Sequence, residues 1–291
     1  MSSGQLERRA AAGGDDLGRR SGSGRRSAAS RLGRRIARRP GIGIGLSSVI
    51  IGLVVWSLLS HLEVLPGRWV PSPGEILEEF VYLVKNGYNS IPLAEHVGMS
   101  LRRTTIGFML GAGLGIPLGL VIGQSRVFGS AVYPYFAILR PIPAIALIPI
   151  IILFSGIGEL SKVLVIFSAS FLYITPTVAD GARQLRVEWV HACQSLGASR
   201  RQLIRHVYLP GSMPFIMTGL KIGATISWSA VVAAELIAAR SGLGSMVMDA
   251  ATFYRVSDVY VGVALIGLIG FLLQLMISIA ERRILHWAGK A

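Results

Sequence analysis

The residues that could carry chemistry are few, and none of them forms a set that is typical of an enzyme. The five histidines occur singly, and the one cysteine, Cys193, rules out an internal disulfide and any cysteine-based metal cluster. The sequence contains no G-x-x-x-x-G-K-[ST] nucleotide-binding motif, no G-x-S-x-G turn and no H-E-x-x-H pair. We therefore expect no catalytic residues and no metal ligands in this chain.

Three residues inside apolar stretches are candidates for lining a pathway across a membrane, namely Arg140, Trp228 and Glu235. Ionisable side chains in such stretches suggest a functional role by default, although Arg140 fits an interface anchor equally well. In a pathway, its guanidinium would offer positive potential to an anion. Glu235 would repel an anion, so a structural partner in the 239–257 loop is favoured for it. Packing is favoured for Trp228, since large aromatic residues mainly supply buried area.

The composition identifies the elements that must hold these residues as membrane helices. Hydrophobic residues make up 52% of the 291 residues and charged residues only 15%, against about 25% in a soluble domain. The net charge is +14, but 11 of the 29 lysines and arginines lie in residues 1–40. A nucleic-acid surface would place them on the folded part. We expect an integral membrane protein whose basic tail is disordered, contacts membrane lipid and binds no nucleic acid.

Apolar stretches of about 20 residues, the length that crosses a membrane, occur six times. They predict an all-α protein with six transmembrane helices, at residues 42–60, 104–125, 133–158, 163–179, 216–237 and 259–280. The first stretch is longer than a signal-peptide core and no small-residue cleavage site follows it, so we expect it to be retained. Along the second, glycines recur every fourth residue from Gly107 to Gly123, which predicts close helix packing.

The distribution of lysine and arginine predicts the orientation, because short cytoplasmic loops are enriched in both. Basic residues gather before the first span, in residues 183–206 and at the C-terminus, whereas residues 63–100 carry five glutamates against two basic residues. Both termini are therefore predicted to be cytoplasmic. Arg102 and Arg103 fall on the predicted outer side, where we expect them to snorkel from an interfacial helix. The predicted parts are the tail 1–40, the first transmembrane helix 41–62, the external segment 63–100 and a core at 101–287.

The loop at 183–210 between the fourth and fifth spans is longer than a simple connector. Apolar residues from Val187 to Leu196 recur with helical spacing, and Gly197 suits the left-handed residue that ends a helix. Ser199 can cap a second helix over residues 200–208, which we expect Pro210 to end. A cytoplasmic helix–turn–helix is thus predicted between two spans.

This loop resembles a known motif. His191-Ala192-Cys193-Gln194-Ser195-Leu196-Gly197, then nine residues, then Val207-Tyr208-Leu209-Pro210 is similar to the E-A-A-x-x-x-G-x9-I-x-L-P loop of ATP-binding-cassette (ABC) importer permeases. In that family the loop forms a coupling helix that docks in a groove of the ATPase subunit. The resemblance assigns this role to His191, Ala192, Cys193, Gly197, Leu209 and Pro210. It departs from the family at His191, where glutamate is usual.

The resemblance extends over about residues 42–287. Leu139-Arg140-Pro141-Ile142-Pro143 resembles part of the permease core, and the stretch 233–244 resembles the taurine and aliphatic-sulfonate branch, which is grouped with nitrate and bicarbonate permeases. It implies a type I ABC importer permease in a bacterial inner membrane, working as a pair of copies, most simply a homodimer. The implied partners are an ABC ATPase dimer and an extracytoplasmic substrate-binding protein. No cofactor is expected in this chain, because the partner ATPase would bind ATP and Mg²⁺.

The implied substrate is taurine or another aliphatic sulfonate, with nitrate, bicarbonate or an aromatic carboxylate as alternatives. Two other classes stay open on the sequence. An ATPase-independent secondary transporter or channel would need intramembrane charges for ion coupling or an inverted repeat. The sequence has few such charges and no obvious repeat. A membrane scaffold without transport is the third class. Uptake that depends on ATP and a binding protein separates the importer from both.

Overall fold

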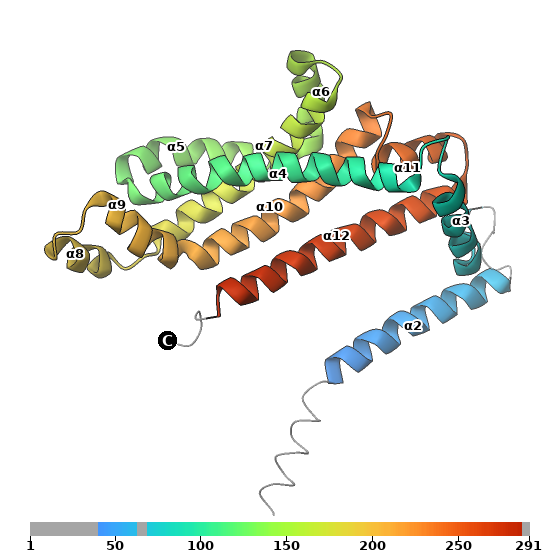
Figure 1. The fold of residues 1–291 in the computed structure, drawn as a ribbon, viewed down its shortest axis with the longest axis horizontal. Helices are drawn as coiled ribbons and strands as arrows, with labels where there is room; N and C mark the ends of the chain where they lie inside the picture. The colour runs from blue at the N-terminus through green and yellow to red at the C-terminus, as the bar shows by residue number, and fades with distance from the viewer. Residues whose placement is uncertain (1–39, 63–68, 287–291) are drawn as a thin grey trace, which may run out of the picture. The chain divides into compact units, whose positions relative to one another are not determined.

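The computed structural model describes residues 40–62 and 69–286, with side chains from residue 47 onward. Within these ranges the chain is helical apart from turns and one isolated β-bridge between Tyr88 and Ile91 (Figure 1), so the all-α prediction is confirmed there. The helices are α2 (Pro40–His61), α3 (Pro73–Asn86), α4 (Leu93–Gln124), α5 (Arg126–Leu139), α6 (Ala144–Ser155), α7 (Glu159–Arg183), α8 (Val187–Ser195), α9 (Arg200–Leu203), the π-helix η2 (Ile204–Tyr208), α10 (Leu209–Ala238), α11 (Leu243–Thr252) and α12 (Val256–Ile284).

Helix α2 belongs to a unit of its own, while α3 to α12 form a second unit. The 22 residues of α2 cover the first predicted span, which is therefore confirmed as a helix. The predicted tail, except for its last residue, lies outside the described residues.

Four helices of the second unit are long and apolar enough to cross a membrane. They are α4, the 25-residue α7, the continuous helix Arg200–Ala238 and α12. The fourth, fifth and sixth predicted spans lie within these helices, and so does the second except for its last residue, Ser125, so the four are confirmed as helical.

The third predicted span is wrong as a single helix. Residues 126–155 form two helices, α5 and α6, that meet at an angle of 101°. The break falls at Pro141 and Pro143, since proline supplies no backbone N–H to continue a helix. Pro143 is the N-cap of α6, with an extended backbone.

The glycines of α4 pack directly against α7, as their spacing predicts. A Cβ atom at Gly107 would lie 2.6 Å from the Cβ of Ile166, and one at Gly119 would lie 2.8 Å from the Cβ of Val178. Residue numbers rise together along the two helices, so α4 and α7 run parallel and begin at the same end of the unit. The chain must therefore return through α5 and α6, in spite of their bend.

Helix α10 packs on α7 and runs in the opposite direction. Its glycines contact the middle of α7, where a Cβ at Gly223 would lie 2.7 Å from Ile174 Cγ1. Beyond α10, the chain turns into α11 and α12, and Met246 and Val261 bury a small core with Leu83 of α3. Figure 1 shows the outcome, with α3 and α11 near one end of this unit and α8 and α9 at the other.

Candidate functional site

The turn after α8 has the geometry that its sequence predicts. Gly197 has a φ of +80°, the left-handed conformation. Its N–H donates to the carbonyl of Gln194 at 2.9 Å, and the N–H of Ala198 donates to that of Cys193 at 3.0 Å. These two bonds form a Schellman motif, which satisfies the last carbonyls of a helix and requires a residue tolerant of positive φ. The predicted helix end at Gly197 is confirmed.

The second helix of the loop begins as predicted but does not end as predicted. Ser199 accepts a hydrogen bond from the N–H of Gln202, whose side chain accepts one from the N–H of Ser199, so the two residues form a capping box. Pro210 does not end the helix, because the chain continues through the π-helix η2 into α10. The N–H of Leu209 donates to the carbonyl of Ile204, five residues back, a spacing that accommodates a proline within a continuous helix.

The loop leaves apolar side chains uncovered. None of the nine residues of α8 is buried, Leu196 is 88% exposed and Trp189 is 53% exposed. Trp189 also lines a hollow of about 330 Å³ together with His206, Val207, Pro210 and Gly211. Exposed apolar residues beside a hollow are typical of a docking surface for another protein.

The predicted loop residues divide into two groups. His191 and Ala192 are exposed on α8, and Cys193 is half-buried beside them. Leu209 and Pro210 lie at the start of α10, where Pro210 borders the hollow that Trp189 lines. The loop thus places the small residues of α8 and the Leu-Pro pair on either side of the Gly197 turn.

A buried ion network occupies the opposite end of the unit. The guanidinium of Arg103 donates two hydrogen bonds to Glu159, at 2.8 and 2.7 Å, and one to Glu235 at 2.7 Å. It also donates to the carbonyl of Ser241 at 2.6 Å. Arg103 and Glu235 are each 1% exposed. Two carboxylates around one planar guanidinium compensate for much of the cost of removing these charges from water.

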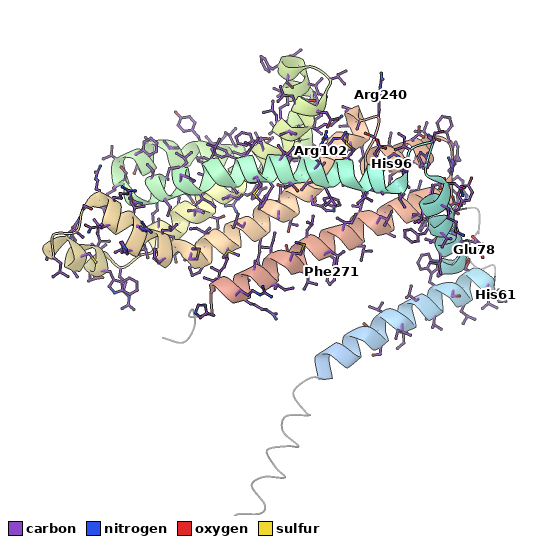
Figure 2. All side chains as sticks on the ribbon, in the orientation of Figure 1. His61, Glu78, His96, Arg102, Arg240 and Phe271 are labelled. Carbon is purple, nitrogen blue, oxygen red and sulfur yellow. The ribbon has the colours of Figure 1, made fainter. Side chains whose placement is uncertain are left out.

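Polar groups from the start of α11 complete this network. The Ser100 hydroxyl donates to the Glu235 carboxylate at 2.8 Å and accepts from the Leu243 N–H, while the Gly244 N–H donates to the same carboxylate at 3.0 Å. His96, 2% exposed, contacts Gly242 through Nδ1. In Figure 2 His96, Arg102 and Arg240 lie toward this end. The network therefore joins α4, α7, α10 and the α10–α11 turn.

The expectation that Arg103 snorkels toward the interface is wrong. Its side chain points inward because carboxylates of α7 and α10 neutralise it, and the sequence alone does not place these helices beside it. Arg102, the other half of the pair, fits the expectation better, since its side chain is 57% exposed and approaches Glu159 at 3.7 Å. The predicted partner of Glu235 in the 239–257 loop is present in Gly244, but the main charge partner is Arg103.

Comparison with known proteins identifies the family. Residues 115–286 match the model of the binding-protein-dependent transport system inner membrane component. The chain is 36% identical over 256 residues to the taurine transport system permease protein TauC of Escherichia coli strain K12, covering 88% of this chain and 92% of TauC. The chain belongs to this family. It is an ABC importer permease.

Other relatives are named for different substrates. A putative aliphatic sulfonates transport permease, SsuC of Bacillus subtilis strain 168, is 31% identical over 84% of this chain and 87% of its own length. The nitrate import permease NrtB of Synechocystis sp. strain PCC 6803 is 32% identical over 80% of this chain and 86% of its own. An inward-facing structure of the MetNI methionine ABC transporter matches with a TM-score of 0.57 at 20% identity, covering 66% of this chain and 95% of that one. This likeness supports the type I importer fold.

The permease is not an enzyme, since ATP hydrolysis in this family is carried out by a partner ATPase. It is a multi-pass component of the inner membrane. The coupling role of the loop residues and the pathway role of the three candidates below stay predictions.

Arg140 of the permease lies at the break between α5 and α6. Its guanidinium carbon lies 5.0 Å from the centre of the Tyr173 ring, and the Tyr173 hydroxyl donates to the Arg140 carbonyl at 3.1 Å. These contacts fasten the bend to α7. If Arg140 lines the pathway, it must do so while it keeps these contacts with Tyr173.

Trp228 and Glu235 lie on α10 in different surroundings. Trp228 is 7% exposed and donates from Nε1 to the Ile266 carbonyl of α12 at 2.9 Å, while its ring borders a hollow of about 290 Å³ that Thr225 and Gln274 also line. Glu235 is held inside the ion network. The structure thus does not bring Arg140, Trp228 and Glu235 together.

Proposed function

We propose that this permease imports a small organic sulfonate, with taurine or another aliphatic sulfonate as substrate. The observation that carries the proposal is the similarity to TauC, at 36% identity over nearly the full length of both chains. The similarity to SsuC, which is named as a putative aliphatic sulfonates transport permease, supports the same chemical class. Nitrate is the competing substrate, because NrtB is 32% identical over a slightly shorter range.

In the proposed mechanism, two copies of the permease form the pathway and each contributes one loop at 183–210 to an ATPase dimer. An extracytoplasmic binding protein delivers the sulfonate to the outer face. ATP and Mg²⁺ bind to the ATPase subunits, and this chain holds no cofactor. Closure of the ATPase dimer moves the coupling helices and opens the pathway outward, so that the substrate crosses by alternating access.

The proposed orientation puts both termini and the 183–210 loop in the cytoplasm, with the segment 63–100 outside. Two features support it. The α8–α9 end carries the arginines at 183, 186, 200, 201 and 205. Lys221 of α10 forms an ion pair with Glu281 of α12, so the basic end of α12 lies on the α8–α9 side of the unit. Positive charge therefore gathers at one end, as the positive-inside rule requires of a cytoplasmic face.

The test is uptake by membrane vesicles that contain the permease with its ATPase and binding protein. We expect radiolabelled taurine or an alkanesulfonate to accumulate only with ATP and the binding protein. Nitrate, bicarbonate and an aromatic carboxylate in excess should leave this uptake unchanged. Accumulation of nitrate instead, with no sulfonate uptake, would overturn the substrate while leaving the permease assignment intact.

A further inference from the structure

A cavity lies beside the coupling loop, and the residues that line it are different from those of the Trp189 hollow. It has a volume of about 700 Å³ and is formed where α4 ends, α5 begins, α7 ends and α8 begins. Val187 and Val190 of α8 form one wall, and Tyr208 of η2 contributes to another. The volume falls in the range of a site for a small molecule or a lipid headgroup.

The charged side chains that line this cavity are all arginines. Arg126 and Arg183 line it, both are exposed, and neither forms a salt bridge within the part of the chain that the structure describes. The carboxylate of Asp180, which does not line the cavity, accepts a hydrogen bond from the Tyr133 hydroxyl at 3.1 Å. The ring of Tyr133 lies 4.4 Å from the guanidinium carbon of Arg183, which it holds at the cavity. The residues that line the cavity therefore carry a net positive charge.

Uncharged groups in the same lining suit an anion. Ser125 is the N-cap of the 14-residue α5, so the positive end of that helix dipole points toward the cavity mouth. The Gln124 side chain also lines the cavity and supplies further hydrogen-bond donors, whereas the Ser130 hydroxyl already donates to the Arg126 carbonyl at 2.8 Å. Two guanidinium groups and these donors are the chemistry that binds phosphate oxygens.

The surface next to the cavity distinguishes a lipid from a soluble anion. Val127 and Phe128, which follow Arg126 on α5, are 84% and 41% exposed. Apolar side chains directly beside a basic cavity at the end of membrane helices can contact acyl chains while the arginines hold the headgroup. Basic pockets of this kind between transmembrane helices are typical sites for anionic headgroups.

We propose that this cavity binds the phosphate of an anionic phospholipid at the membrane surface, with Arg126 and Arg183 as its main ligands. Because Val187 and Val190 form a wall of the same cavity, a bound headgroup contacts the coupling helix α8 and restrains its position against α5 and α7. The lipid thus acts on the element that is proposed to dock the ATPase, and the inference stands whichever substrate the permease carries.

The experiment is native mass spectrometry of the permease–ATPase complex in detergent. The probes are dioctanoyl phosphatidylglycerol, dioctanoyl phosphatidylcholine and inorganic phosphate. The variants are Arg126→Gln and Arg183→Gln. The matched control is Arg283→Gln, an exposed arginine in the last turn of α12 that does not line the cavity.

We expect the wild-type complex to retain phosphatidylglycerol in preference to phosphatidylcholine. Each cavity variant should weaken that retention about fivefold, and Arg283→Gln should not change it. Inorganic phosphate at equal concentration should not displace the lipid. Equal retention of both lipids, or unchanged retention in both cavity variants, overturns the site. Displacement by inorganic phosphate, with both arginines still required, overturns the lipid in favour of a soluble anion.

Discussion

At the scale of single residues, Arg103 shows how one side chain joins three helices. It is 1% exposed and donates to a carboxylate at the start of α7, to another near the end of α10 and to the Ser241 carbonyl. A buried arginine is tolerated only while these partners stay in place, since removing one leaves an uncompensated charge. The contacts therefore hold one end of the helix bundle in a single arrangement.

Glu235→Gln should destabilise the permease by about 3 kcal/mol, because it removes a buried carboxylate from Arg103 while Glu159 still neutralises part of the charge. The amide can keep the hydrogen bond from Ser100 but not the ion pair. The measurement is the free energy of unfolding in detergent, followed by helical circular dichroism during denaturant titration.

The matched control is Glu281→Gln, which breaks the ion pair with Lys221. The side chains of that pair are 26% and 25% exposed, so solvent screens the interaction and the loss should not exceed about 1 kcal/mol. Equal losses in the two variants would contradict the view that burial makes the Arg103 network the stronger restraint.

The sequence could not predict this network, because its partners are distant along the chain. Arg103 is 56 residues from Glu159 and 132 from Glu235. Charge patterns in loops report only which side of the membrane a residue favours. The one sign of it in the sequence was that two arginines, Arg102 and Arg103, fall on the side predicted to be outside. Snorkelling was the explanation available from sequence. For Arg103 the correct explanation is that carboxylates of distant helices neutralise its charge.

At the scale of elements, the structure at the start of the coupling loop is determined by adjacent residues, whereas its end is determined by the helix into which it continues. Gly197 and Ser199 are found from sequence because a left-handed cap and a capping box each depend on a few adjacent residues. The end of the second helix was mispredicted because Pro210 is accommodated by η2 rather than ending the helix. The bend between α5 and α6 was missed although its prolines were visible, since prolines are also tolerated inside membrane helices.

Gly197→Glu should abolish co-purification of the ATPase while leaving membrane insertion intact. At a φ of +80° a side chain costs about 1–2 kcal/mol. Nothing lies within 4 Å of the new Cβ atom, so we expect the side chain to extend into the space that a docked partner would fill. The measurement is the ratio of ATPase to permease after affinity purification from membranes.

Gly156→Glu is the matched control for this variant. Gly156 has a φ of +76° and equally open space around its Cβ position, but it caps α6 rather than the loop. Its ψ of 173° lies in a region that is more restricted than the left-handed one, so the backbone strain should be at least as large, and the variant should still keep the ATPase. Normal co-purification with Gly197→Glu, or equal loss in both variants, would remove the loop from the docking surface.

At the scale of the second unit, the parallel packing of α4 and α7 fixes which ends lie together. Helix α7 begins at the Arg103 network and ends at the arginine-rich coupling loop, and α4 reaches Arg103 ten residues after its start at Leu93. The apolar stretches of the sequence predicted most of these helices. Whether α4 and α7 run parallel depends on whether α5 and α6 together return the chain to the other side of the membrane. Hydropathy alone does not answer this for two helices that meet at 101°.

Cys193 allows the proposed orientation to be tested in the natural sequence, because it is the one cysteine of the chain and is half-buried on α8. A membrane-impermeant maleimide should label it in inside-out vesicles and not in intact spheroplasts, and added ATPase should reduce the labelling. The control is the double variant Cys193→Ser/Lys85→Cys, which moves the thiol to the exposed side of α3 in the segment predicted to be outside. That variant should be labelled in spheroplasts only. The reverse pattern for both thiols would show that the orientation is opposite to the one proposed. The coupling loop would then lie on the side of the membrane without ATP, which would exclude its proposed contact with the ATPase.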